Sequence, residues 1–203
     1  MEELIRQGSE VPFGYTAVTE LNGKNREMLM DFGLLRLRQG ETYRDDRPLE
    51  KAYLLVYGKV RLAWDGKTHE EYRENCFDVS PTALHVNRAT AVEITCLSAD
   101  CEINILRTDN DTLFENHLYL PVETADEYRG KGTMRECSTR IVRTIFDDTN
   151  APQANLVLGE VIGFPGKWSS YPPHHHPQPE VYFYRFDYPH GFGAGFANGD
   201  VYK

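Results

Sequence analysis

Cysteine is scarce in this chain, and its spacing does not match the usual paired motifs. Four cysteines occur, and no two of them form a CxxC pair: Cys76, Cys96, Cys101 and Cys137. The first fifteen residues contain no apolar run of signal-peptide length. We therefore expect reduced, mostly buried thiols in a cytoplasmic protein. A zinc site built from these cysteines is the weaker alternative.

Long apolar runs and basic charge are also in short supply. No stretch approaches the roughly eighteen apolar residues that a membrane-spanning helix requires. The chain has 31 acidic and 22 basic residues, a net charge of −9 and a pI of about 5.3. This balance argues against a nucleic-acid partner and against docking on an anionic membrane. The sequences GxGxxG, GxxxxGK[ST] and GxSxG are absent, so nucleotide-cofactor chemistry and the serine-hydrolase elbow are not expected.

Short β-type runs separated by turn residues dominate residues 28–108. From Leu35 to Arg38 leucines alternate with arginines, which is the two-residue period of a half-buried strand. The segment 51–67 holds two apolar runs on either side of Gly58 and ends in an Asp-Gly turn signal, which predicts a hairpin. Without a convincing amphipathic helix, this pattern is typical of an all-β sandwich or barrel.

The remaining residues divide by composition into three segments. Residues 1–27 form a charged N-terminal segment, and residues 109–140 form a polar connector with few β runs. A second β pattern covers residues 141–203 and includes a predicted aromatic strand over 180–186, followed by a glycine-rich hairpin.

The most informative stretch is YPPHHHPQPEVYFYR, which begins at Tyr171. In an extended segment, His174 and His176 point to the same side and His175 points away. Glu180 follows after a proline-rich turn. Two imidazoles and one carboxylate are a ligand set that suits a first-row divalent metal. The alternative, a histidine-rich surface loop that binds nothing, is of comparable weight on spacing alone.

Arginines and tyrosines near this stretch are further candidates for a site. Arg129 or Arg140 could hold a carboxylate, because a guanidinium matches that group with two hydrogen bonds. Alternatively, these arginines are solvated or paired with nearby glutamates. Alternation places Tyr182 and Tyr184 on the same side as Glu180, where a tyrosine could donate a proton. Both rings could equally fill the interior of a barrel.

The order of strand, HxH, Glu and strand resembles the first metal motif of the cupin superfamily. WSSYPPHHH, EVYFYRF and GFG, with EYRGKGTMRECSTRIVRTIFDD upstream, narrow this resemblance to the 5-deoxyglucuronate isomerase family of myo-inositol catabolism. That family is related to the 4-deoxy-L-threo-5-hexosulose-uronate ketol-isomerases of pectin breakdown. The resemblance is specific over about 127–196. It departs from the cupin pattern at the flanking glycines, since Gly166 lies too far upstream and Gly191 too far downstream.

The resemblance implies a tandem cupin, in which each unit is a double-stranded β-helix or jelly roll. Residues 28–108 would be a first cupin without metal, and residues 141–203 a second cupin that looks incomplete at its C-terminus. Metal ligands would be His174, His176 and Glu180, with zinc favoured and manganese or iron possible. The family's fourth ligand, a histidine, has no counterpart here. We expect truncation, completion by a partner, or a decayed family member.

Histidines are missing from the equivalent place in the first cupin. Asp45, Asp46 and Glu50 stand there instead, and the later His85 is isolated. We expect His85 to be a hydrogen-bonded structural residue. The first cupin would then serve as a structural or dimerising unit.

The implied activity is aldose–ketose isomerisation of a deoxy sugar acid, from 5-deoxyglucuronate to 5-dehydro-2-deoxygluconate. Catalytic roles would fall to Glu180, Tyr182 and Tyr184, and the substrate carboxylate would be held by Arg129 and Arg140. We expect a small-molecule sugar acid as the partner, in a homo-oligomer. Alternatives are a uronate ketol-isomerase, a non-catalytic cupin that binds sugar or metal, and a purely structural β-protein.

Overall fold

A computed structural model describes residues 10–172, 174, 176–193, 195–197 and 200–202. Within these residues the chain is built of strands with three single-turn 3₁₀ helices, η1 (Arg26–Met28), η2 (Pro121–Glu123) and η3 (Met134–Glu136). The predicted all-β class is therefore confirmed. No helix in this part of the chain is long and apolar enough to cross a membrane.

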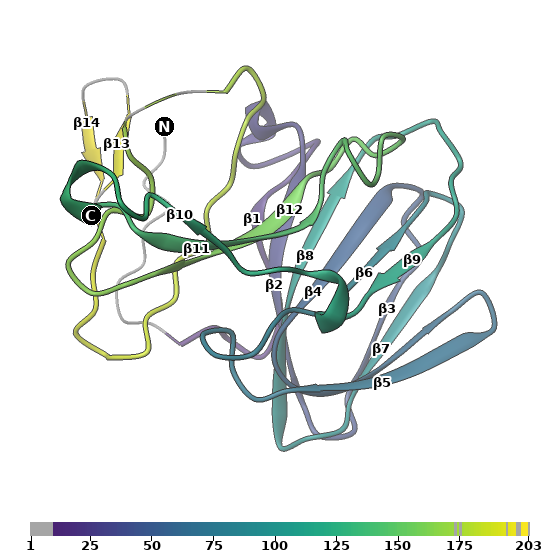
Figure 1. The fold of residues 1–203 in the computed structure, drawn as a ribbon. Helices are drawn as coiled ribbons and strands as arrows, with labels where there is room; N and C mark the ends of the chain where they lie inside the picture. Colours follow the sequence, from purple (N-terminus) through teal and green to yellow (C-terminus); the bar gives the residue numbers. More distant parts are fainter. Residues whose placement is uncertain (1–9, 173, 175, 194, 198–199, 203) are drawn as a thin grey trace.

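The first unit consists of two β layers that share one strand (Figure 1). The larger layer has the order β1-β2-β8-β4-β6-β9, with bounds Gly14–Thr19, Asp31–Arg38, Asp100–Thr108, Glu50–Trp64, Ala83–Val86 and His117–Tyr119. The smaller layer pairs β3 (Thr42–Asp45) with β7 (Val92–Cys96), β7 with β4, and β4 with β5 (Lys67–Arg73). All these pairings are antiparallel. Strands β1 and β9 come from the predicted N-terminal segment and connector.

Strand β4 belongs to both layers because it bends at Gly58. Its first half pairs with β6 and β8, and its second half pairs with β5 and β7. Gly58 has a φ of +97°, and a Cβ there would lie 2.6 Å from the carbonyl oxygen of Asp100. The turn predicted after Trp64 is present, but the two apolar runs around Gly58 form one bent strand rather than the two arms of a hairpin.

The larger layer is buried on both faces, and each face has its own apolar cluster. Between the layers lies the inner cluster, composed of Leu35, Leu37, Tyr53, Leu55, Val60, Leu62, Trp64, Leu84, Val86, Val92, Ile94, Cys96, Cys101, Ile103 and Ile105. The opposite face carries the outer cluster, composed of Phe32, Ala52, Leu54, Ala83, Leu106, Tyr119, Ile145, Phe146, Ala151, Leu156 and Leu158. The outer cluster joins residues of the first unit to residues beyond 140.

The second unit is a small antiparallel sheet in the order β10-β11-β12 (Figure 1). Its strands are β10 (Glu127–Arg129), β11 (Arg140–Phe146) and β12 (Leu158–Gly163). Along β11, buried Ile141, Arg143 and Ile145 alternate with half-buried residues, so one face packs on the first unit. A separate hairpin pairs β13 (Gly195–Ala197) with β14 (Asp200–Tyr202), at the C-terminal end of the stretch in which a glycine-rich hairpin was predicted.

Ion pairs and hydrogen bonds cross the junction between the two units. Arg73 on β5 donates to both carboxylate oxygens of Glu160 on β12, at 2.8 and 2.7 Å, and its side chain is only 1% exposed. Glu50 on β4 accepts from the backbone N–H groups of Asn155 and Leu156 at 2.9 and 3.2 Å. Because an unpaired buried charge is costly, these contacts fix how the units dock.

Candidate functional site

Both described histidines of the motif lie in the long segment that follows β12. Between Gly163 and β13, the described residues form no strand. The start of this segment is tied to the η3 loop, where Trp168 donates its backbone N–H to the carbonyl oxygen of Cys137 at 2.8 Å. Lys167 Nζ donates to the carbonyl oxygen of Glu136 at 2.7 Å. These bonds bring the segment back beside the glycine loop that precedes β11.

His174, His176 and Glu180 are neighbours in space. The ring centroids of the two histidines are 5.0 Å apart, nearly perpendicular, and His176 Nε2 lies 3.5 Å from Glu180 Oε1. His174 Nδ1 donates to the carbonyl oxygen of Pro172 at 2.9 Å, which leaves its Nε2 available. Metal-binding histidines commonly donate their second ring nitrogen to a carbonyl in this way. The donor types and this bond fit a divalent metal.

The three side chains do not form a completed metal site. Among the residues that the structure describes, no three histidine, cysteine, aspartate or glutamate side chains are gathered closely enough to hold an ion. Glu180 is 44% exposed, and its second oxygen accepts a hydrogen bond from Tyr182. His175, predicted to face away from the other two, lies outside the described residues.

The prediction of a strand over 180–186 is wrong, although the predicted alternation is present. These residues have no β partner within the described part of the chain. Val181 and Phe183 pack against the outer cluster, whereas Tyr182 and Tyr184 are exposed, with ring centroids 6.1 Å apart. The side chains of this stretch therefore alternate between buried and exposed as in an extended chain, without β pairing in the described part of the protein.

Tyr182 is hydrogen-bonded to one of the candidate ligands. Its hydroxyl donates to Glu180 Oε2 at 3.1 Å. Partial burial, together with the negative charge of Glu180, raises the pKa of Tyr182 to about 12. Burial also raises the pKa of Tyr184. Both side chains are therefore neutral hydrogen-bond donors near pH 7.

Arg129 and Arg140 are direct cross-strand partners on β10 and β11. Arg129 also pairs with Glu127 at 2.9 Å, and both of those side chains are about half exposed. Arg140 donates through Nη1 to the carbonyl oxygen of Ser138 at 3.0 Å, while its buried Nε has no protein partner within the described residues. Like charges directly opposite each other destabilise a sheet. An anion between the two guanidinium groups would relieve that repulsion.

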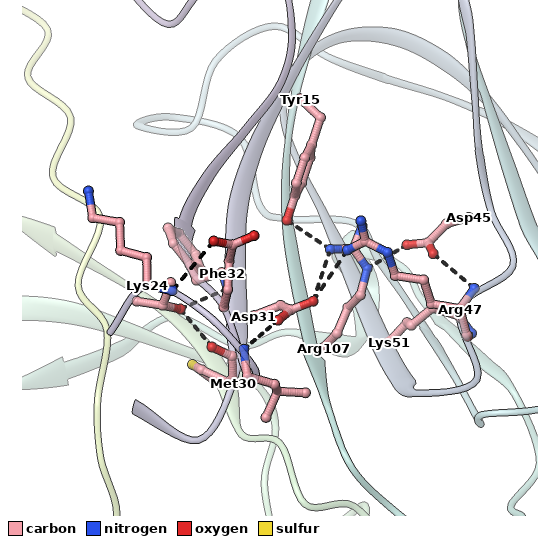
Figure 2. Close-up of polar contacts among 12 residues, drawn as sticks. Tyr15, Lys24, Met30, Asp31, Phe32, Asp45, Arg47, Lys51 and Arg107 are labelled. Atoms are coloured by element: carbon pink, nitrogen blue, oxygen red, sulfur yellow. Dashed lines mark hydrogen bonds and ion pairs between the residues drawn. The ribbon is translucent and has the colours of Figure 1, made fainter. Parts of the chain in front are cut away.

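The first unit contains a buried polar cluster at one end of the space between its layers (Figure 2). Arg107 is fully buried and donates to Asp45 at 2.6 Å, to the Tyr15 hydroxyl at 2.8 Å and to the Tyr43 hydroxyl at 2.9 Å. Asp31 lies 3.8 Å from the same guanidinium. This cluster fills the interior with paired charges and was missed in the sequence. The sequence does contain a signal for it: Arg107 follows Ile103 and Ile105 at the two-residue spacing of a strand, which predicts that its side chain also faces inward.

Lys51 lies in the same cluster and is fully buried. Its ammonium donates to the carbonyl oxygens of Arg47 and Leu49 at 2.7 and 3.0 Å. Burial lowers the pKa of Lys51 to about 8, although the charge of Asp45 acts in the opposite direction.

The prediction for His85 as a structural residue agrees with its surroundings. Its Nε2 lies 2.8 Å from Glu50 Oε1, both side chains are at most 1% exposed, and its ring stacks on Phe146 with centroids 4.2 Å apart. Burial alone would raise the pKa of Glu50, but hydrogen bonds from His85, Asn110 and Asn155 lower it. Glu50 therefore serves as a charged acceptor at the junction of the two units.

Comparisons with known proteins relate most of the chain to one family. The family model described as the KduI/IolB family matches residues 4–201. A protein named 5-deoxy-glucuronate isomerase from Bacillus subtilis strain 168 is 29% identical over 214 residues, covering 100% of this chain and 77% of the relative. Another of that name, from Halalkalibacterium halodurans, is 28% identical and covers 87% of this chain and 66% of the relative. An IolB-like protein from Salmonella typhimurium LT2 has a similar fold, with a TM-score of 0.55, 18% identity and coverage of 69% of this chain and 52% of that one.

Proposed function

Because this chain belongs to the KduI/IolB family, we propose that it is an aldose–ketose isomerase of a deoxy sugar acid. The substrate is 5-deoxyglucuronate, and the product is 5-dehydro-2-deoxygluconate, a step of inositol catabolism in the cytoplasm. The observation that carries the proposal is the family match over residues 4–201. Relatives named 5-deoxy-glucuronate isomerase, at 26–29% identity to this chain, support this substrate.

His174, His176 and Glu180 are the residues that would hold a divalent metal, with zinc favoured over manganese and iron. The hydrogen bond from His174 to Pro172 presets one imidazole for this role. When bound, such a metal supplies a Lewis acid for the oxygen of the enediol-type intermediate.

Tyr182 is the proposed proton donor to the substrate oxygen. Its pKa of about 12 keeps the phenol protonated at neutral pH, and Glu180 accepts its hydrogen bond. Tyr184 stacks beside Tyr182 and restricts its ring. Glu180, Tyr182 and Tyr184 together form the proposed catalytic group.

Arg129 and Arg140 are the proposed holders of the substrate carboxylate. Two observations support this role: the two arginines occupy directly paired positions on β10 and β11, and a carboxylate matches guanidinium geometry. Removing Arg140 is expected to raise KM at least tenfold with little change in kcat, because this contact is the same in ground and transition states. Arg135→Met is the matched control on the exposed η3 turn, and it is expected to leave KM unchanged.

The experiment is an isomerase assay with 5-deoxyglucuronate combined with metal analysis. Wild type is expected to convert the sugar, and His174→Ala is expected to lose both metal and at least 100-fold in kcat. His190→Ala, an exposed histidine outside the motif, serves as the control and should keep both. Full activity in His174→Ala would refute the metal role. If the chain converts only 4-deoxy-L-threo-5-hexosulose-uronate, its activity is instead that of the ketol-isomerases of pectin breakdown.

A non-catalytic cupin that binds sugar or metal is the second candidate. It is favoured by one observation, the lack of a closed three-ligand group within the described residues. A chain that binds zinc and the sugar acid but releases no ketose would establish this candidate. The proposal also includes a homo-oligomer, which light scattering of the purified chain tests directly.

A further inference from the structure

Residues 181–185 lie against the first unit, and their contacts with it among the described residues are made by side chains. Val181 and Phe183 pack into the outer cluster, and Arg185 points to the same side. Within the described residues no strand pairs with this stretch. Its position therefore depends on what these three side chains contact.

Arg185 makes the one charged contact of this stretch with the first unit. Its Nη2 donates to Oε1 of Glu102 on β8, and its guanidinium lies 5.5 Å from the centre of the Tyr57 ring. The Glu102 side chain is only 2% exposed, and Arg185 is its hydrogen-bonding side-chain partner among the described residues. A carboxylate this deeply buried strongly requires a cation, so the pair is a firm attachment point.

The attachment point is close to the candidate ligands along the chain. Glu180 precedes Arg185 by five residues, and an extended chain advances by only about 3.3 Å per residue. Alternation turns Tyr182 to the side opposite Arg185, where its hydroxyl meets Glu180. Glu180 in turn lies 3.5 Å from His176. Fixing Arg185 thus restricts where the Glu180 carboxylate can lie.

We infer that the Arg185–Glu102 pair is the positioning contact for the metal ligand Glu180, so that a residue of the first unit sets the geometry of the site in the second. The inference rests on the metal site of the proposed function. It gives the first unit a role in organising the site of the second. Arg185 and Glu102 touch neither metal nor substrate and act through the extended stretch between them and Glu180.

Zinc affinity, measured by competition with a chromophoric chelator on the full chain, tests the inference. Arg185→Met and Glu102→Gln are each expected to weaken zinc binding about tenfold, as second-layer contacts typically do. The double variant should be no weaker than either single one, because both remove the same contact. Arg185→Lys, which keeps a cation, should recover part of the affinity.

The controls separate positioning from general destabilisation. Arg61→Met and Glu70→Gln break an ion pair of 2.7 Å that lies half exposed on β4 and β5, and zinc affinity should stay at the wild-type value. If Arg185→Met or Glu102→Gln lowers only the melting temperature of the zinc-free protein, or if their effects on affinity add, the inference is overturned. Where Arg185→Met does not fold, Glu102→Gln and Arg185→Lys decide. A wild-type chain that takes up no zinc overturns the metal site itself.

Discussion

Lys51 offers a quantitative test of the polar cluster inside the first unit. Its pKa lies at about 8, compared with 10.5 for an ordinary lysine, mainly because the side chain is buried. A lysine with a lowered pKa in the folded state releases its proton there while the unfolded chain still keeps it. The free energy of unfolding therefore rises with pH between these two values.

The expected gain follows from the size of this difference. Each pH unit in this window contributes up to about 1.4 kcal/mol. Between pH 8 and pH 10 the Lys51 contribution should grow by roughly 2 kcal/mol. Replacing Lys51 with methionine keeps most of the volume and removes the titrating group, so this contribution disappears in Lys51→Met.

Urea unfolding, followed by the fluorescence of the buried Trp64, provides the assay. The measured quantity is the difference in unfolding free energy between wild type and Lys51→Met at pH 8, 9 and 10. Burial raises the pKa of Tyr43, Tyr53 and Cys101, and these groups destabilise the fold at high pH. Because both proteins contain them, their contributions largely cancel in the difference.

The exposed Lys67 is the matched control, because Lys67→Met removes a lysine from the start of β5 without touching the cluster. Its difference from wild type should be independent of pH over the same range. The unfolding free energy of wild type minus that of Lys51→Met is expected to rise with pH. If this difference is instead constant, or falls with pH, then Lys51 is not desolvated as its burial implies. The account of the cluster would then be refuted.

Two stability predictions concern the shared strand and the junction. Gly58→Ala should cost about 3 kcal/mol, because its Cβ meets backbone at 2.6 Å, whereas Gly66→Ala, with open space around it, should cost about 1 kcal/mol. Equal costs in thermal or urea unfolding would contradict the close approach at Gly58. Glu160→Gln should cost about 3 kcal/mol by leaving the buried Arg73 uncompensated, whereas Glu70→Gln on the exposed pair should leave the unfolding free energy nearly unchanged. A loss below 1 kcal/mol for Glu160→Gln would show that Arg73 does not depend on this carboxylate.

Strand positions were largely predictable because they follow from local alternation. The inward leucines of β2 appear where the two-residue period places them, and β11 and β12 lie within the predicted second β pattern. The turn after Trp64 was also readable from its Asp-Gly pair. Gly58 was misread because glycine signals a turn and a bend equally well, and only the opposing strand decides between them.

The error at 180–186 has a different origin. The aromatic alternation of this stretch is present in the structure, but a strand also needs a partner with free backbone groups. Within the described residues no such partner lies beside it. Local sequence therefore predicted the orientation of each side chain correctly while leaving the backbone pairing undetermined.

Contacts that join the two units could not be predicted from local pattern. Arg73 and Glu160 are separated by 87 positions, and Arg185 and Glu102 by 83. The chain offers 22 basic and 31 acidic residues, so a great many pairings are possible. Burial selects among them, because only the right partner offsets the cost of removing each charge from water.

Strand β4 has a mechanical consequence for the first unit. Since one uninterrupted backbone runs through both layers, neither layer can detach without tearing hydrogen bonds in the other. Amide protons on the two sides of the bend should exchange with solvent in a single concerted opening rather than in separate steps. A protease that cuts this one strand would dismantle both sheets together.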